Sequence, residues 1–392
     1  MYISLRGGRL SKAVPANVVA LGAVSLVTDI SAEMITAVLP LYLVGALGLS
    51  LVQFGLLDGL YFGVTALVRL AGGHAADRWQ RRKLVAGLGY GLSAVCKLGL
   101  LAAGSSVPWL GAVVAADRTG KGLRTAPRDA LISLSVPPAG LGGAFGVHRA
   151  MDAVGALLGP LAAFAVLTAT AGAYDAVFVT SFCVAVLGVL LLVLYVGDRR
   201  EPLAAGASIR STFRLLADRR FRRVCLVAAA LGLVTVSDPF VYLLLLRGGD
   251  TVTPELFPLL PLGTAAVYLL LAIPLGRLAD RVGRVAVFLG GHVALALAYL
   301  VLIGPGWLVP VLVLHGAFYA ATDGVLMAVA GPLLPAGLRT GGLALLQTGQ
   351  ACARMVSSIA FGVLWAAWGA QPGLIVMAAG LVVAALLAWR TL

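Results

Sequence analysis

Hydrophobic residues in this chain form long, nearly uninterrupted blocks, and most polar residues gather in the short stretches between them. A helix of about twenty apolar residues, rising about 1.5 Å per residue, crosses the roughly 30 Å hydrocarbon core of a bilayer. The pattern therefore predicts an all-α, polytopic membrane protein. Twelve transmembrane helices are expected, at 14–44, 51–75, 84–104, 107–132, 143–169, 174–196, 224–246, 254–276, 284–303, 307–330, 342–366 and 372–389.

Composition agrees with this prediction. Of the 392 residues, 60% are hydrophobic and 11% are charged, and the mean hydropathy is +1.01, whereas a soluble protein is about half apolar. Cys96, Cys183, Cys225 and Cys352 lie inside hydrophobic blocks without the spacing of metal ligands. We interpret these cysteines as packing residues and expect neither a metal nor a cofactor.

The net charge of +13 is distributed unevenly between the two sides of the predicted membrane. Basic residues near the N-terminus, in 78–83, 199–223 and 277–284, and at Arg339 and Arg390 fall on one side, and Arg247 falls on the other. The positive-inside rule makes the basic side cytoplasmic. We expect an uncleaved first helix and cytoplasmic N- and C-termini in the cell (inner or plasma) membrane. The basic residues then orient the protein in the lipid bilayer, and no nucleic acid is expected as a partner.

Related sequence recurs at corresponding places in the two halves of the chain. Gly73, Asp77 and Arg78 are matched by Gly276, Asp280 and Arg281, each 203 positions later. This offset indicates an internal repeat. We predict a six-helix bundle at 1–196, a charged cytoplasmic linker at 197–223 and a second six-helix bundle at 224–392. Two pseudo-symmetric bundles suit alternating access.

Four short motifs stand out at the ends of spans or within them. The two repeated loop sequences comprise Gly73, Asp77, Arg78 and Arg81 after span two, and Gly276, Asp280, Arg281, Gly283 and Arg284 after span eight. Span four contains Arg118 and Gly122, and span five contains Gly155, Gly159 and Pro160.

These motifs resemble those of the major facilitator superfamily: its two gating-loop signatures, its span-four arginine motif and the span-five motif of its antiporters. The resemblance covers the whole chain and implies a twelve-span secondary transporter similar to exporters of drugs and small molecules. Gln80 departs from it, because it stands where the first loop signature usually has glycine.

The fourth predicted span carries the densest charge in the chain, in the stretch DRTGKGLRTAPRD at 117–129. A charge at the centre of a bilayer costs about 2.5–3.5 kcal/mol on insertion scales, so these side chains should face protein or water. At about 100° per residue, four of them form one stripe of a helix. The predicted charge network comprises that stripe (Asp117, Lys121, Arg124 and Arg128), its neighbours Arg118 and Asp129, and Arg149 and Asp152 from span five.

Two interpretations of this network stay open. The charges can form permanent ion pairs that lock the bundle, or they can exchange partners between the inward-open and outward-open states. Asp29, Glu33 and Asp152 are the expected acidic partners.

Proton coupling requires a carboxylate that can be both buried and hydrated. Asp29, Glu33 and Asp58 are the candidates, because they lie among apolar residues of the early spans. Asp238 and Asp323 are weaker candidates, while His292 and His315 are interpreted as packing residues. Aromatic and apolar side chains of the second half, namely Tyr242, Tyr268, Phe318, Tyr319 and Met327, predict a hydrophobic or amphiphilic ligand.

The leading hypothesis is a monomeric secondary transporter that exports a small organic solute by proton antiport. One alternative is proton-coupled uptake of an anionic solute, attracted by Lys121, Arg124 and Arg128. A remote alternative is a membrane enzyme acting on lipid-linked phosphates. That activity would need clustered metal-binding acids, and no D-x-x-D pair is present, so the chain is not expected to be an enzyme.

Overall fold

The computed structural model describes residues 15–79, 81–137, 140–198, 209–248, 252–304, 306–335 and 338–392; for residues 69–79, 209–210 and 340 it describes the backbone alone. Within these residues every regular element is helical. The helices of the first half are α1 (Ala16–Leu41, continued by a π-helical turn Tyr42–Ala46), α2 (Leu51–Trp79), α3 (Arg82–Ala103), α4 (Val107–Ser133), α5 (Leu141–Ala169) and α6 (Tyr174–Tyr195). Those that follow are α7 (Ile209–Arg214), α8 (Arg219–Leu233), α9 (Asp238–Arg247), α10 (Leu260–Val282), α11 (Arg284–Ile303), α12 (Leu308–Ala330), α13 (Arg339–Trp368) and α14 (Ala370–Thr391).

In the part of the chain that the structure describes, eleven stretches are long and apolar enough to cross a membrane, and α8 with α9 counts as one of them. Helix α4 is not among the eleven. It has 27 residues, which is sufficient length, but its charged residues lower its hydropathy. Since α4 packs against α2 and α3, it is the twelfth span, and the predicted fold class is confirmed.

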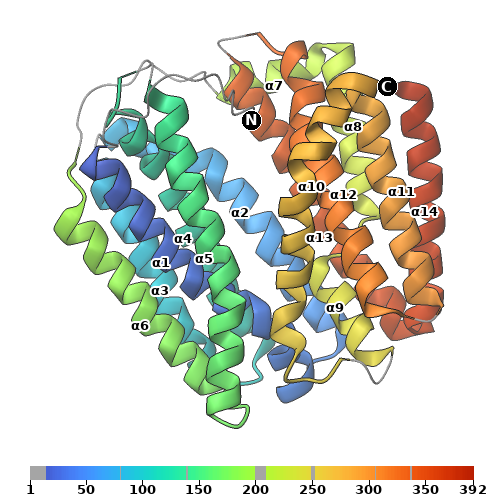
Figure 1. Cartoon of the computed structure of the whole chain (residues 1–392), viewed down its shortest axis with the longest axis horizontal. Helices are drawn as coiled ribbons and strands as arrows, with labels where there is room; N and C mark the ends of the chain where they lie inside the picture. Colours follow the sequence, from blue (N-terminus) through green and yellow to red (C-terminus); the bar gives the residue numbers. More distant parts are fainter. Residues whose placement is uncertain are drawn as a thin grey trace.

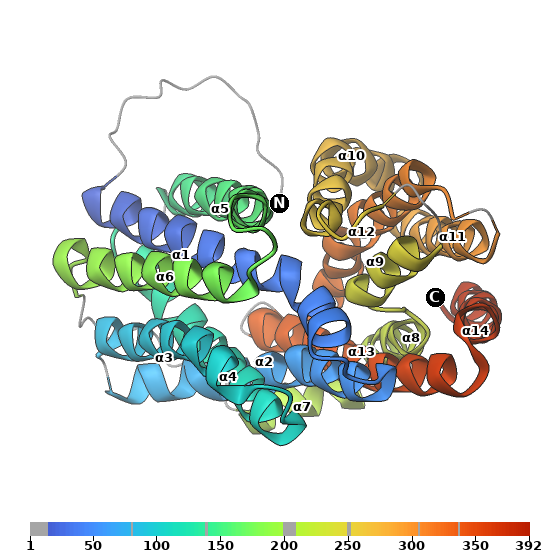
Figure 2. The ribbon, with the colours of Figure 1, turned by 90° about the horizontal axis from the view of Figure 1, so that it is seen from below.

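The helices form two groups that lie side by side (Figures 1 and 2). In the first group α1 packs on α5 and α6, and α3 packs on α4. In the second group α12 packs on α10 and α11, and α8 packs on α13. Helices α2 and α13 form the most extensive packing between the groups. Figure 1 shows the ribbons of the two groups diverging toward the end at which α1 begins and α14 ends.

Span seven differs from the single helix predicted at 224–246. Helix α8 ends at Leu233 and α9 begins at Asp238. Pro239 occupies the first turn of α9, where its missing N–H costs no hydrogen bond, so the Ser-Asp-Pro sequence starts a new helix. The hydroxyl of Tyr299 accepts a hydrogen bond from the N–H of Val236 (2.7 Å), and Ser357 donates to the carbonyl of Thr235 (2.8 Å). Tertiary contacts therefore satisfy the interrupted backbone.

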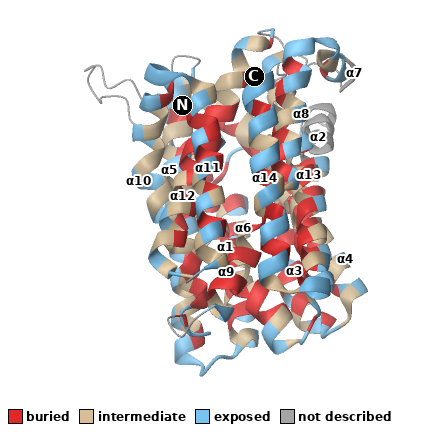
Figure 3. Cartoon of the chain, turned by 90° about the vertical axis from the view of Figure 1, so that its right-hand side faces the viewer, coloured by how far each residue is buried: buried red, intermediate tan, exposed pale blue. Residues whose placement is uncertain are grey.

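Burial follows the pattern expected for a bilayer protein. Large apolar side chains are exposed on outward-facing helices, including Leu270 and Ile273 of α10 and Leu386 and Leu387 of α14. Figure 3 shows exposed positions along α14, in front of buried positions on the helices behind it. These outer faces are suited to contact lipid, whereas the polar and charged side chains described below lie inside.

Candidate functional site

A cavity of about 430 Å³ lies between the two groups of helices. Among the described residues, every charged side chain that lines it is a carboxylate: Glu33 on α1, Asp58 on α2, Asp238 on α9 and Asp323 on α12. The remaining wall is mainly apolar and aromatic, and it includes Phe54, Tyr61, Phe62, Tyr242, Phe257, Tyr268 and Tyr319. The cavity thus offers negative charge on a hydrophobic surface.

Close packing of α1 against α5 positions two of the predicted acids, Asp29 beside Gly155 and Glu33 beside Gly159. A Cβ atom added to Gly159 would lie 2.5 Å from the Cβ of Glu33, and one added to Gly155 would lie 2.5 Å from the carbonyl oxygen of Leu26. Both separations are too short for non-bonded atoms, so glycine allows this helix approach. Pro160, the next residue of the same motif, lines the cavity.

On α4, the first part of the predicted charge network surrounds Asp117. Arg118 forms an ion pair with this neighbouring carboxylate, Ser93 of α3 donates a hydrogen bond to it over 2.5 Å, and Lys97 lies 3.9 Å away. The Arg118 guanidinium stands 3.8 Å from the centre of the Tyr61 ring, and that ring lines the cavity. Arg118 is therefore separated from the central cavity by an aromatic side chain.

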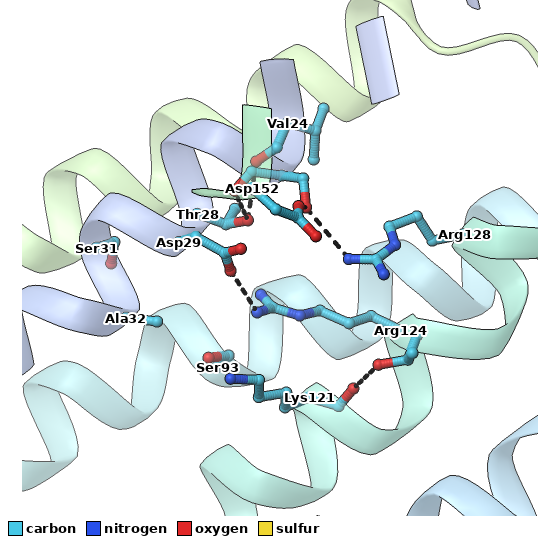
Figure 4. Close-up of polar contacts among 12 residues, drawn as sticks. Val24, Thr28, Asp29, Ser31, Ala32, Ser93, Lys121, Arg124, Arg128 and Asp152 are labelled. Carbon is cyan, nitrogen blue, oxygen red and sulfur yellow. Dashed lines mark hydrogen bonds and ion pairs between the residues drawn. The ribbon is translucent and has the colours of Figure 1, made fainter. Parts of the chain in front are cut away.

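The second part of the network links α4 to α1 and α5. Figure 4 shows Arg124 extending from α4 to Asp29 on α1, and the two side chains are 3.5 Å apart. Arg128 pairs with Asp129 at 3.0 Å and donates a hydrogen bond to Ser25 at 3.2 Å.

Ser25 in turn hydrogen-bonds to Asp152 of α5. His148 and Arg149 each lie 3.6 Å from Asp152. Lys121 is half-buried and has no ion pair within the described chain. The α4 charges are not part of the lining of the central cavity, to which α4 contributes Val114.

A second cluster, which the sequence indicated only weakly, lies in the second group of helices. Tyr319 donates a hydrogen bond to Oδ1 of Asp238 (2.5 Å), and Arg354 of α13 donates to the Tyr319 hydroxyl (3.3 Å). His315 lies 3.4 Å from the same carboxylate oxygen. The signal was present in the sequence, because His315, Tyr319 and Asp323 recur every four residues and so share one face of α12.

A side-chain hydrogen bond joins the two groups. Ser358 of α13 donates a hydrogen bond to Asp58 of α2 at 2.6 Å and also contacts the carbonyl of Gly55 at 3.1 Å. The sequence gives no signal for Ser358, because a serine in an apolar span has no pattern that distinguishes it. The partner is identified only when α2 and α13 are placed together.

The structure describes the side chains of the second gating-loop signature but only part of the first. The side chains of Gly73, Asp77 and Arg78 lie outside the described residues, and Arg81 is exposed immediately before α3. In the second copy, Gly283 ends α10 at φ +105°, a conformation that favours glycine.

Beyond that turn, Arg284 lies 3.4 Å from Asp280 and donates a hydrogen bond to the carbonyl of Ala328 on α12 (2.8 Å). Arg281 and Gly276 lie on α10, with Arg281 exposed. The described contacts of Asp280 and Arg284 thus stay within the second group of helices.

A family model for the Major Facilitator Superfamily matches residues 21–250 and 240–392. The chain belongs to this superfamily. An uncharacterized MFS-type transporter of Methanocaldococcus jannaschii is 30% identical to it over 361 residues, covering 89% of this chain and 88% of that one. An uncharacterized protein of Mycobacterium tuberculosis is 37% identical over 158 residues, 39% of this chain and 37% of that protein.

Solved transporter structures share the fold of this superfamily member. The nucleoside transporter NupG, in a mutant form, has a TM-score of 0.84 at 13% identity, covering 95% of this chain and 99% of that one. A POT family transporter in complex with 5-aminolevulinic acid gives 0.80 at 14% identity, covering 96% of each chain. A bacterial homologue of the lysosomal transporter Spinster, inward-facing and unoccupied, gives 0.74 at 19%, covering 95% of this chain and 96% of that one. The chain is therefore a multi-pass membrane transporter of a small molecule and not an enzyme.

Proposed function

We propose that this transporter exports a cationic, amphiphilic organic solute in exchange for protons. The observation that carries the proposal is the composition of the cavity wall, whose charged members Glu33, Asp58, Asp238 and Asp323 are all acidic. A carboxylate that faces an apolar and aromatic cavity attracts an organic cation, and the tyrosine and phenylalanine rings provide faces for cation–π contact.

Competition for these carboxylates explains why the exchange should be antiport. A protonated carboxyl group is neutral and loses its Coulombic attraction for the solute, whereas an ionised one binds it. Since a proton and a solute cation cannot neutralise the same oxygen atoms together, loading of one favours release of the other. Alternating access of the cavity to the two membrane faces then moves them in opposite directions. The resemblance of Gly155, Gly159 and Pro160 to the antiporter motif supports the same direction.

Proton-coupled uptake of an anionic solute is less well supported. Arg124 is paired with Asp29, and Arg128 with Asp129, so their charges are already compensated. Lys121 is not part of the cavity lining. An anion in the central cavity would instead face four carboxylates, which would repel it unless they were protonated.

Glu33 and Asp58 exchange protons directly with the cavity. Asp29 contributes to coupling indirectly, through its ion pair with Arg124. The α4 network and the two gating loops reorganise as the bundles rock. We propose cytoplasmic termini in the cell membrane, on the strength of the basic loops. A single chain supplies both walls of the cavity, which favours a monomer.

The proposal is tested in proteoliposomes with a permanently charged fluorescent cation, ethidium, and an imposed pH gradient. Transport of ethidium against the direction of proton flow, accompanied by alkalinisation of the acidic side, is the expected result. Glu33→Gln should weaken the coupled movement. Asp175→Asn is a matched control, because Asp175 is exposed at the start of α6 and outside the cavity. Solute flux that is indifferent to the pH gradient would refute the coupling.

A further inference from the structure

The buried imidazole of His315 lies behind the carboxylate of Asp238. The His315 side chain is 1% exposed and that of Asp238 is 34% exposed, and Nε2 lies 3.4 Å from Oδ1. Asp238 lines the cavity. Neither imidazole nitrogen has a hydrogen bond within the described chain. Asp238 is therefore placed with one side toward the cavity and one oxygen beside a titratable group that is shielded from it.

We infer that His315, when protonated, forms an ion pair with Asp238 and so competes with the solute cation for this carboxylate. This inference rests on the proposed exchange of cations for protons, and it assigns the part of that exchange that takes place between about pH 5.5 and about pH 8.5 to this pair, in addition to Glu33 and Asp58. It also reverses the expectation that His315 is a packing residue.

The transfer of a proton from Asp238 to His315 requires no reactant besides the proton itself. A proton from the cavity binds Asp238 as a carboxylic acid, and its O–H bond then breaks as an N–H bond forms at Nε2 of His315. The product is an imidazolium beside a carboxylate, so Asp238 is again an anion but is already paired. With His315 neutral, the same carboxylate is available to a cationic solute. Both contacts of Asp238 use Oδ1, which leaves Oδ2 without a donor among the described residues.

Charged groups of both signs surround His315. Asp238 of α9 lies 3.4 Å from its Nε2, and Arg354 of α13 donates a hydrogen bond to the neighbouring Tyr319. Tyr242 of α9 and Tyr319 of α12 place their rings 6.3 Å and 5.3 Å from the imidazole. The opposing effects of a cation and an anion suit a group that must gain and lose a proton during each transport cycle.

The remaining polar groups near His315 are set back from it. Asp323 lies two turns along the same helix and lines the cavity. From α10, Thr264 accepts the hydrogen bond of Tyr242 (3.1 Å), and Tyr268 is at the cavity wall. From α11, His292 packs against Phe318, whose ring stacks on His315.

His292 provides a matched control. It is also a buried histidine of the second group of helices, but its Nδ1 lies 2.9 Å from the carbonyl oxygen of Phe288 in its own helix. It is in no ion pair with a described carboxylate. Replacing it removes a buried imidazole without changing the surroundings of Asp238.

The test is equilibrium binding of ethidium and tetraphenylphosphonium to the purified full-length chain at about pH 5.5 and about pH 8.5, which bracket the ordinary titration of histidine. Both cations are permanently charged, so pH acts only on the protein. We expect the wild type to bind roughly tenfold more weakly at the lower pH, a difference of about 1.4 kcal/mol. His315→Gln should bind at the wild-type high-pH affinity and lose most of this pH dependence, and His292→Gln should behave like the wild type. His315→Asn replaces His315→Gln if the latter fails to fold.

A fixed charge provides the converse measurement. His315→Lys should bind the cations weakly at both pH values, because its ammonium group pairs with Asp238 permanently. The inference is overturned if His315→Gln keeps the wild-type pH dependence, if His292→Gln loses as much of it, or if the wild type binds equally at both pH values. Wild-type protein that binds neither cation at either pH instead refutes the proposed cationic solute.

Discussion

The carboxylate of Asp58 on α2 accepts a hydrogen bond from Ser358 on α13, 2.6 Å away. These two helices form the most extensive packing between the groups. Glycines bring their backbones together, since a Cβ added to Gly55 would lie 2.6 Å from the carbonyl oxygen of Ser358 and one added to Gly362 would lie 2.5 Å from that of Leu51. A cavity carboxylate is thereby connected directly to the contact between the bundles.

Removing this hydrogen bond should loosen the packed end of the transporter. Ser358→Ala removes the hydrogen bond that Ser358 donates to the Asp58 carboxylate, and a hydrogen bond to a charged group contributes about 1.5–3 kcal/mol. We expect the population in which α2 and α13 are separated to rise roughly tenfold. Spin labels at Ser50 and Gln371, both exposed, should show a longer distance component in the variant.

Thr348→Val is the control for that experiment, because among the described residues the Thr348 hydroxyl bonds only to the carbonyl of Ala344 in its own helix. It should leave the distance distribution unchanged. An unaltered distribution in Ser358→Ala would show that the hydrogen bond does not stabilise the packed state.

Gly159→Ala should destabilise the protein by forcing α1 away from α5. The added methyl group would collide with the Cβ of Glu33 and approach the carbonyl of Ile30 (2.9 Å), and overpacking of this kind costs about 1–3 kcal/mol. The apparent Tm of the purified protein should fall. Gly146→Ala on the same helix meets nothing within 4 Å, so its Tm should stay the same or rise, as alanine favours helix. Equal Tm values for the two variants would contradict this packing.

The pair formed by Asp29 and Arg124 should show strong coupling in a double-mutant cycle. Arg124→Gln leaves a carboxylate uncompensated inside the first group of helices, and breaking a buried pair costs about 3 kcal/mol when little solvent reaches it. Asp29 is 20% exposed on its side chain, so a smaller loss of unfolding free energy is expected here. Asp29→Asn combined with Arg124→Gln should recover part of that loss. Strictly additive effects would mean that the ion pair contributes nothing.

Glu33→Gln should weaken solute binding without lowering the stability of the protein. Glu33 lines the cavity and is in no ion pair or hydrogen bond with another described side chain, so its charge is available to a ligand. Loss of that charge should raise the Kd for ethidium roughly tenfold, equivalent to about 1.4 kcal/mol, while the Tm stays close to that of the wild type. Isothermal titration measures the Kd. A large fall in Tm with an unchanged Kd would assign Glu33 a structural role instead.

Much of the candidate site could be predicted from the sequence where the signal is local. The α4 stripe was recognisable because several charges in one apolar block cannot face lipid, and the partnership of Arg124 with Asp29 agrees with the acids expected on span one. The cluster around Asp238 was underestimated. The spacing of His315 and Tyr319 shows that they share one face of α12, but nothing in the sequence indicates that Asp238 of α9 and Arg354 of α13 meet that face.

The sequence also could not distinguish the surroundings of Asp29 from those of Glu33. Asp29 and Glu33 are four residues apart and looked equivalent as candidates, yet one is paired with Arg124 and the other faces the cavity. A difference of about 40° around the helix axis is enough to turn two side chains toward different neighbours. Which neighbour each one meets depends on how α1 is rotated against α4 and α5.

The sequence by itself determined the membrane-spanning architecture, because the bilayer imposes its thickness and its exclusion of charge on every span separately. It also revealed the internal repeat, because a repeat is a similarity between two parts of one amino-acid sequence. Only the tertiary structure decided which charges the cavity presents. That outcome depends on contacts between helices distant in sequence, where a glycine, a tyrosine ring or a helix break sets which side chain reaches the central space and which is retained behind it.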